Sequence, residues 1–284
     1  MQIKLAECSN VDGKHHLEII RDITQEEIDL FYEKQKPVSL YIHTKNLHSI
    51  AIANANSLVT FLNNVFSNDS SVDKMKGKDI YLEGNRLLAN YCSSISMFID
   101  QAIKMLSKKD EEKKNCFEQQ DRKLYDDKFE YRFFKMLRHY ILHYGLPFTR
   151  YYKSIYRGYG LVLARNHLLE YNGWKHVRND LEQMAEEIDI RPYVKPMNVN
   201  LTILLLKFLY LLSKEIVEAL EECDKLLNIH EVKAPAIVKY ESIEEFKNGN
   251  MICTPINFES IKTAFDDLKR HPKISLNISR GNTQ

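Results

Sequence analysis

Glycine and proline are scarce in this sequence, with 9 glycines and 7 prolines among 284 residues. Sandwiches and barrels of β-strands need many turns, and turns draw heavily on these two residues. The shortage therefore argues against an all-β fold and favours long helices. Acidic and basic residues nearly balance, and the formal net charge is +1. No basic field over the whole protein attracts nucleic acid, so a nucleic-acid site would have to be local.

Cysteines are also few, and they are widely spaced along the chain. The five are Cys8, Cys92, Cys116, Cys223 and Cys253. None forms a CxxC pair or has a spacing typical of a zinc site, so we expect no structural metal. The odd number of cysteines and the lack of an apolar signal segment at the N-terminus favour reduced, mostly structural thiols in a cytoplasmic protein.

No hydrophobic run is long enough to suggest a membrane helix. The most apolar segment, Leu201 to Leu212, is interrupted by Lys207 and followed by Lys214 and Glu215. It is too short and too charged to cross a bilayer, so we expect a buried helix and no membrane association. The sequence also lacks a Walker A loop and the motifs GxGxxG, HExxH and GxSxG, and we expect no cofactor.

Helical periodicity dominates what the sequence does contain. Thr24 and Glu27 have the form of a capping box that opens a helix to about residue 36, and Pro37 is placed to open the next one. Apolar residues recur at helical spacing in segments 38–66, 79–108, 124–144 and 199–227, and further helices are expected at 174–188 and 258–269. Short strands are expected at 155–165, 236–240 and 251–254.

These patterns predict an all-α protein, an antiparallel bundle of long helices with small irregular or β additions near 155–165 and after 231. We expect residues 1–230 to form the helical domain and residues 231–284 to form a small C-terminal appendage. The charged run 108–122 is compatible with either a helix or a loop.

One stretch departs from the charge balance of the chain. Residues 131–169 contain seven Arg or Lys and ten Phe or Tyr, but no Asp or Glu, and Glu130 and Glu170 flank them. Such a basic and aromatic surface is typical of a local nucleic-acid site. Most of the aromatic residues within the helix are also at spacings that suit packing in a core.

Within this stretch, Arg138, His139 and His143 lie near the end of a predicted helix. His139 and His143 are four residues apart and share a face, whereas Arg138 and His143 are about 140° apart around the axis, within reach of a long side chain. The helix dipole favours a protonated imidazole in the last turn. Imidazole can transfer protons and guanidinium can stabilise phosphoryl oxygens, so these residue types suit phosphodiester cleavage.

The run Arg138-His139-Tyr-Ile-Leu-His143 resembles the Arg-x4–6-His signature of the HEPN superfamily, in which Asn, Asp or His usually follows the arginine. The resemblance covers roughly residues 79–227 by helix order, and its specific part is residues 137–147. It implies a helical bundle and a metal-independent endoribonuclease, in bacterial defence or a toxin–antitoxin system. It also implies a homodimer whose two motifs face a shared cleft.

The resemblance also implies roles for the motif residues. Arg138 would position the scissile phosphate, His143 would act as general base or acid for attack by the ribose 2′-OH, and His139 would be an accessory donor. Some members carry a tyrosine two residues after the motif histidine, where an antitoxin modifies it. Here that position is Gly145 and the tyrosine is Tyr144, which puts in doubt this form of control by a neutralising protein partner.

Side chains beyond the motif helix are candidates for RNA binding. Arg150, Lys153 and Arg157 could contact RNA phosphates, and Tyr151 is one of four tyrosines among them that could stack on bases. The alternative is an ordinary exposed loop with packed tyrosines.

Other interpretations of the motif remain open. His143 could be a structural histidine at a helix end and Arg138 a salt-bridged surface residue. The histidine pair could bind a metal, although the segment offers no nearby acidic or cysteine ligand. The chain could thus be a non-catalytic helical module that binds RNA or a protein, or, third, a membrane-peripheral or metal-binding helical protein. Burial of His143 in a dry core would favour the non-catalytic module.

Overall fold

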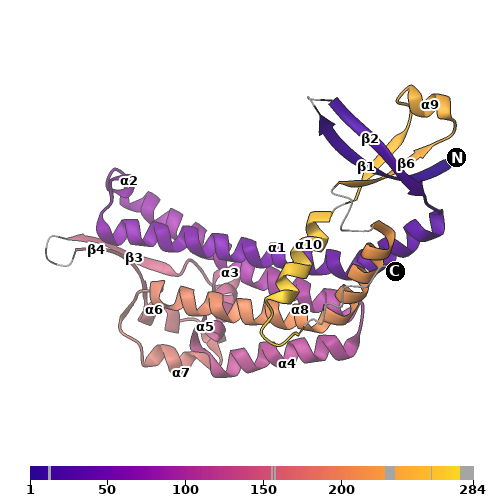
Figure 1. Cartoon of the computed structure of the whole chain (residues 1–284). Coiled ribbons are helices and arrows are strands. Elements are labelled where there is room, and N and C mark those ends of the chain that lie inside the picture. Colours follow the sequence, from indigo (N-terminus) through magenta and orange to yellow (C-terminus); the bar gives the residue numbers. More distant parts are fainter. Residues whose placement is uncertain (12–13, 155, 157, 228–233, 257, 276–284) are drawn as a thin grey trace. The chain divides into compact units, whose positions relative to one another are not determined.

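A computed structural model of the chain describes all residues except 12–13, 155, 157, 228–233, 257 and 276–284. The described part is mostly helical with two small antiparallel sheets (Figure 1). It divides into two compact units. We call Met1–His43 with Leu209–Gln284 the terminal unit, and Thr44–Phe208 the central unit.

The central unit contains most of the helices and a three-stranded sheet of order β3-β4-β5. Its helices are the later part of α1 (Gln25–Ser67), α2 (Ser70–Asp73), α3 (Gly77–Ser107), α4 (Glu111–Asp127), α5 (Phe129–His143), α6 (Arg165–Leu169), α7 (Val177–Glu182) and the first part of α8 (Arg191–Leu227), with a 3-10 turn η1 (Asn172–Trp174). Its strands are β3 (Phe148–Ser154), β4 (Gly158–Ala164) and β5 (Glu187–Ile188).

The terminal unit combines both ends of the chain. It contains β1 (Gln2–Val11), β2 (Lys14–Asp22), the start of α1, the end of α8, β6 (Pro235–Tyr240), α9 (Ile243–Lys247), β7 (Ile252–Pro255) and α10 (Phe258–Lys269). The strands form one antiparallel sheet of order β2-β1-β6-β7, in which Ala6 of β1 lies opposite Ala236 of β6. The segment predicted as a C-terminal appendage thus shares a sheet with the N-terminal strands.

Several predicted elements are confirmed. Thr24 and Glu27 form the capping box, since the Glu27 backbone N–H donates to Thr24 Oγ1 at 3.1 Å and the Thr24 N–H donates to Glu27 Oε2 at 2.7 Å. The helix at 258–269 has the predicted bounds, and strands lie where β additions were expected, at β4, β6 and β7. The charged run 108–122 is largely helical, because it falls mostly within α4.

Other boundaries were predicted wrongly. Pro37 lies inside α1, which continues through it, because the buried Val38 and Tyr41 pack the helix on past this point. The helix expected at 124–144 is divided at Lys128, whose backbone is extended (φ −120°, ψ 111°). The helix expected at 174–188 is instead the short α7 followed by β5. Each of these differences reflects packing between elements rather than local propensity.

The core of the central unit is rich in aromatic side chains from α3, α5 and η1. The Tyr91 and Phe134 rings meet edge to face with centroids 5.2 Å apart, and the Trp174 ring stacks on Tyr140 at 5.5 Å. All four side chains are fully buried. Each large apolar side chain contributes about 1.5–3 kcal/mol on burial, so this cluster fixes α5 and the η1 turn together.

His48 of α1 makes the stability of this core depend on pH. Its ring packs on Phe98 with centroids 5.6 Å apart, and a ring nitrogen lies 3.2 Å from Thr202 Oγ1. Burial, and then the nearby Lys45, lower the pKa of His48 from 6.5 to about 4. Below pH 6.5 the unfolded chain therefore binds a proton that the folded chain does not, so stability falls as the pH drops from 6.5 to about 4.

We expect this loss to reach about 2 to 3 kcal/mol at the acid end of that window, since each pKa unit corresponds to about 1.4 kcal/mol. Urea unfolding of wild type and His48→Gln between pH 7 and pH 4 measures it, with His43→Gln, an exposed histidine of the same helix, as control. The His48 variant should lose part of the acid sensitivity and the control should keep it. Equal pH slopes for all three proteins would contradict the assignment.

Candidate functional site

The packing of α5 determines which of its side chains face solvent. Tyr131, Phe134 and Leu137 are fully buried and fix the rotation of the helix. The opposite face therefore carries His139 and His143, whose side chains are exposed. Their rings lie nearly parallel, with centroids 6.1 Å apart and an interplanar angle of 20°. His143 does not lie in a dry core, which was the condition that favoured a non-catalytic module.

Arg138 is half-buried beside the two histidines, at the boundary of α5 and α3. Burial raises the pKa of the Cys92 thiol on α3, and the positive charge of Arg138 offsets part of that effect. Among the described residues no carboxylate forms an ion pair with Arg138, so the interpretation as a salt-bridged surface arginine receives no support. The rings of His139 and His143 are in contact, and the charge of Arg138 acts on His139.

A further basic side chain, Lys175, follows the η1 turn and acts on His139. Trp174 is fully buried, stacks on Tyr140, and donates from Nε1 to the Leu168 carbonyl at 2.6 Å. The next residue, Lys175, has a positive φ of 52°, which is uncommon outside glycine, and its charge acts on His139. The sequence analysis did not identify Lys175. The signal in the sequence is Trp174, the single tryptophan, which precedes Lys175 and packs on Tyr140 of α5.

The electrostatics of the group centre on His139. Its pKa is lowered, first by burial and then by four positively charged or chargeable neighbours: Arg138, His143, Lys175 and Lys135. Lys135 is itself paired with Asp121, at 2.9 Å. The neighbours with the largest effect on this pKa are all basic side chains. The surroundings therefore favour the neutral imidazole of His139, the form that can accept a proton.

A carboxylate does lie near the end of α5, but other groups hold it. Glu170 accepts a hydrogen bond from Tyr144 Oη at 2.8 Å, and His167 Nδ1 lies 3.2 Å from the same Glu170 oxygen. This hydrogen bond raises the pKa of Tyr144. The contacts that hold Glu170 are therefore with Tyr144 and His167.

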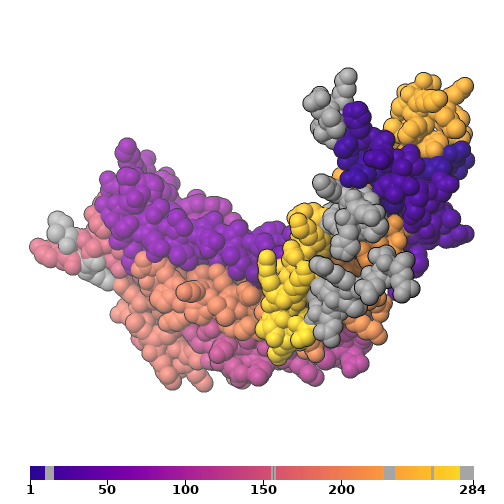
Figure 2. All heavy atoms as spheres, in the orientation of Figure 1, coloured from indigo at the N-terminus to yellow at the C-terminus, as the bar shows by residue number. Residues whose placement is uncertain are grey.

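Three of the predicted RNA-binding residues, Arg150, Tyr151 and Lys153, lie on β3 of the β3–β4 hairpin, which projects from the helices of the central unit (Figures 1 and 2). Arg150 pairs with Glu186 at 3.0 Å and with Glu187 at 3.4 Å. Lys153 pairs with Asp73 at 2.8 Å and lies over the Tyr159 ring. Tyr151 is half-buried next to Gly77 of α3. Arg157 lies outside the described residues. RNA would have to compete with these carboxylates for Arg150 and Lys153.

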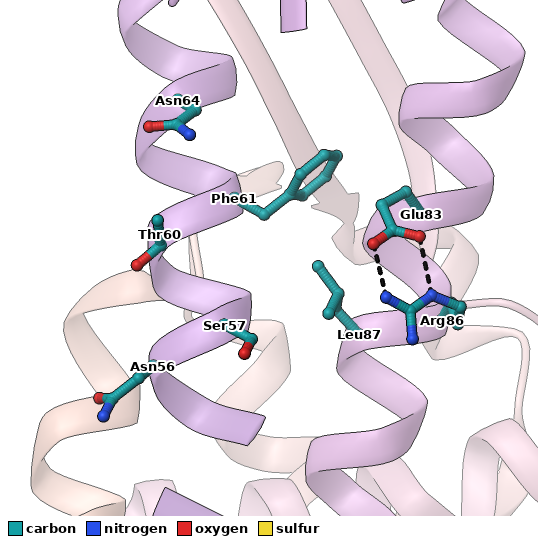
Figure 3. A pocket seen from close by; sticks show the side chains of 8 residues that line it. All are labelled: Asn56, Ser57, Thr60, Phe61, Asn64, Glu83, Arg86 and Leu87. Carbon is teal, nitrogen blue, oxygen red and sulfur yellow. Dashed lines mark hydrogen bonds and ion pairs between the residues drawn. The ribbon is translucent and has the colours of Figure 1, made fainter. Parts of the chain in front are cut away.

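The described surface also has an open pocket of about 530 Å³ between α1 and α3 of the central unit. It is lined by Asn56, Ser57, Thr60, Phe61, Asn64, Glu83, Arg86 and Leu87, and Figure 3 shows the Glu83–Arg86 ion pair at its wall. None of the motif residues lines it. The histidines of α5 therefore act, if they act on a ligand, at an open surface rather than in this pocket.

Comparison of the chain with protein-family models, curated proteins and solved structures gave no significant match. Within the described part of the chain, no group of three or more His, Cys, Asp or Glu side chains is arranged to hold a metal ion. None of the described helices combines the length and apolar character that a membrane crossing requires.

Proposed function

We propose that the chain is a metal-independent endoribonuclease of the HEPN type that cleaves RNA in the cytoplasm. The observation that supports the proposal is the pair of exposed, nearly parallel imidazoles of His139 and His143, together with the positive charges of Arg138 and Lys175 that act on His139. Two accessible imidazoles next to fixed positive charge provide both proton transfer and stabilisation of a phosphoryl group. The setting in defence or toxin–antitoxin systems follows from the resemblance of the motif alone.

The electrostatics suggest how the roles are divided. His139, whose lowered pKa favours the neutral form, takes the proton of the ribose 2′-OH, and the 2′ oxygen attacks the adjacent phosphorus. The bond to the 5′ oxygen breaks, and that oxygen receives a proton from the His143 side chain. Arg138 and Lys175 balance the charge on the non-bridging oxygens. The products are a 2′,3′-cyclic phosphate and a 5′-OH, and no metal ion is needed.

A second copy of the chain would convert this open surface into a cleft. Leu142, Tyr144 and Leu146 lie beside His143 and are 56%, 44% and 43% exposed. Exposed apolar side chains next to a catalytic group suit a face that a partner covers. We therefore include the homodimer implied by the motif in the proposal, with the two sets of histidines facing one another.

The decisive experiment is RNA cleavage by the purified full-length protein in EDTA. Wild type is expected to cut an oligoribonucleotide and leave cyclic phosphate ends, and to leave intact the same oligonucleotide with a 2′-deoxy sugar at every position. A protein with both Arg138→Ala and His143→Ala should be inactive. Arg122→Ala and His43→Ala, which alter exposed residues away from α5, serve as matched controls. Cleavage of the deoxy substrate, or equal activity in all proteins, would contradict the proposal.

A further inference from the structure

Two cysteines from opposite ends of the chain meet in the terminal unit. Cys8 lies on β1 and Cys253 on β7, and their Sγ atoms are 3.9 Å apart although 245 positions separate them in sequence. The strands β1 and β7 are not hydrogen-bonded neighbours, because β6 lies between them in the sheet. The contact is therefore made by side chains across an intervening strand.

The register of the strands places the two cysteines on the same face of the sheet. Ala6 lies opposite Ala236, and Cys253 lies opposite Val238, two residues further along β6. Since side chains two apart along a strand share a face, Cys8 and Cys253 lie on the same face of the sheet. That face carries the small apolar cluster around Ala6, Val238 and Tyr240. The twist of the sheet lets side chains of non-adjacent strands converge there.

We propose that Cys8 and Cys253 form a reversible disulfide by exchange with a low-molecular-weight disulfide such as oxidised glutathione. The exposed Cys253 thiolate attacks one glutathione sulfur, forms a mixed disulfide and releases one glutathione thiolate. The Cys8 thiolate then attacks the Cys253 sulfur and releases the second. Two protein thiols are oxidised by two electrons, the glutathione disulfide is reduced to two thiols, and the two protons pass to them.

The reaction brings the two sulfurs closer together. A disulfide bond is about 2.05 Å long, so the sulfurs must approach by roughly 1.9 Å from their 3.9 Å separation, with some movement of the strands on either side of β6. Cys92 and Cys223 are buried, and Cys116 lies on α4 of the central unit. Burial, and then the neighbouring Cys253, raise the pKa of Cys8 to about 11, so the second exchange step should become faster as the pH rises.

The bond would stabilise the terminal unit by connecting its N-terminal and C-terminal strands. A disulfide that closes a long loop removes much conformational freedom from the unfolded chain. We expect oxidation to raise Tm by roughly 5 to 10 °C, given typical disulfide contributions and the size of the chain. The sequence alone predicted reduced thiols and not this pairing, because no local motif connects two cysteines that are 245 positions apart.

The test treats the full-length protein with reduced or oxidised glutathione, traps free thiols by alkylation, and maps the peptides by mass spectrometry without reduction. We expect a peptide pair joining Cys8 to Cys253 in the oxidised sample alone. The variants Cys8→Ser and Cys253→Ser should each lose it, and Cys253→Ala with Cys8 intact should not gain a link to another cysteine. Cys116→Ser should keep the Cys8–Cys253 link.

Two results would overturn the proposal. One is wild-type protein in which Cys8 and Cys253 are recovered as separate alkylated or glutathione-bound peptides across a range of glutathione ratios at pH 8. The other is a link of either residue to a different cysteine. The mapping of wild type decides the question even if a variant folds poorly, and it does not depend on whether the chain cleaves RNA.

Discussion

Replacing His139 with alanine is expected to slow RNA cleavage by about 10²- to 10⁴-fold, the usual contribution of a positioned general base. The pKa of His139 is lowered by partial desolvation of its exposed ring and then by its basic neighbours Arg138, His143, Lys175 and Lys135. The exposed imidazole makes no hydrogen bond that the described structure provides, so the loss should fall on catalysis rather than on folding. Steady-state cleavage and urea unfolding of the same variant separate the two effects.

The pH profile gives a sharper test of the same residue. Because the pKa of His139 is lowered from 6.5, the acid limb of kcat/KM in wild type should lie below pH 6.5. Lys175→Gln removes one positive charge near the imidazole and thereby favours its protonated form. The acid limb should then move up toward 6.5, in addition to any weaker phosphate binding. Lys195→Gln, at an exposed position of α8, is the matched control and should leave the limb unchanged.

A purely structural role of Lys175 would lower activity at every pH without moving the limb. A limb that stays in place in Lys175→Gln would therefore contradict the proposed effect of the Lys175 charge on the pKa of the base, even if the chain is a ribonuclease. Loss of activity in His139→Ala with an unchanged limb in Lys175→Gln would assign the cation a different role from that of the imidazole.

Local signals predicted the parts of the fold that depend on local chemistry. The capping box at Thr24 and Glu27, the helix at 258–269 and the end of α5 near His143 each follow from a few neighbouring residues. The break at Lys128 has no such signal, because the sequence on both sides of it favours a helix. The pairing of β1 with β6 has no local signal either, since β6 lies more than 220 residues further along the chain, whereas the pairing of β1 with the adjacent β2 is local and was missed.

The same distinction applies to the candidate site. The spacing of His139 and His143 was sufficient to predict that they share a face of one helix. The carboxylates that hold Arg150 and Lys153 come from β5 and α2, and Lys175 reaches His139 only because Trp174 stacks on Tyr140. Tertiary packing determines these contacts, and a single sequence without aligned relatives does not reveal that packing.

Replacing Asn85 with leucine is expected to destabilise the protein by about 2 to 5 kcal/mol, because it leaves two backbone groups buried without partners. The Asn85 side chain is 1% exposed and lies on α3. Its Nδ2 donates to the Phe148 carbonyl at 3.1 Å, and its Oδ1 accepts from the Phe148 N–H at 3.0 Å. A single side chain therefore satisfies both backbone groups of the first residue of β3.

Leucine has a similar volume, so the change tests the hydrogen bonds rather than a cavity. Chemical unfolding measures the loss, with Asn90→Leu, an exposed asparagine of the same helix, expected to stay within about 0.5 kcal/mol of wild type. Equal stability of the two variants would show that water replaces the Asn85 contacts. Amide exchange at Phe148 should accelerate in Asn85→Leu before the rest of the central unit opens.

The position of Asn85 gives this contact a role in the site as well. Phe148 follows the end of α5 by five residues, so the two hydrogen bonds fix where the chain goes after His143. If they are lost, the last turn of α5 keeps the packing of Tyr140 on Trp174 but loses its fixed connection to β3, and the separation of the two imidazoles becomes more variable. Asn85→Leu should then lower RNA cleavage under conditions where the protein is still folded, whereas Asn90→Leu should not.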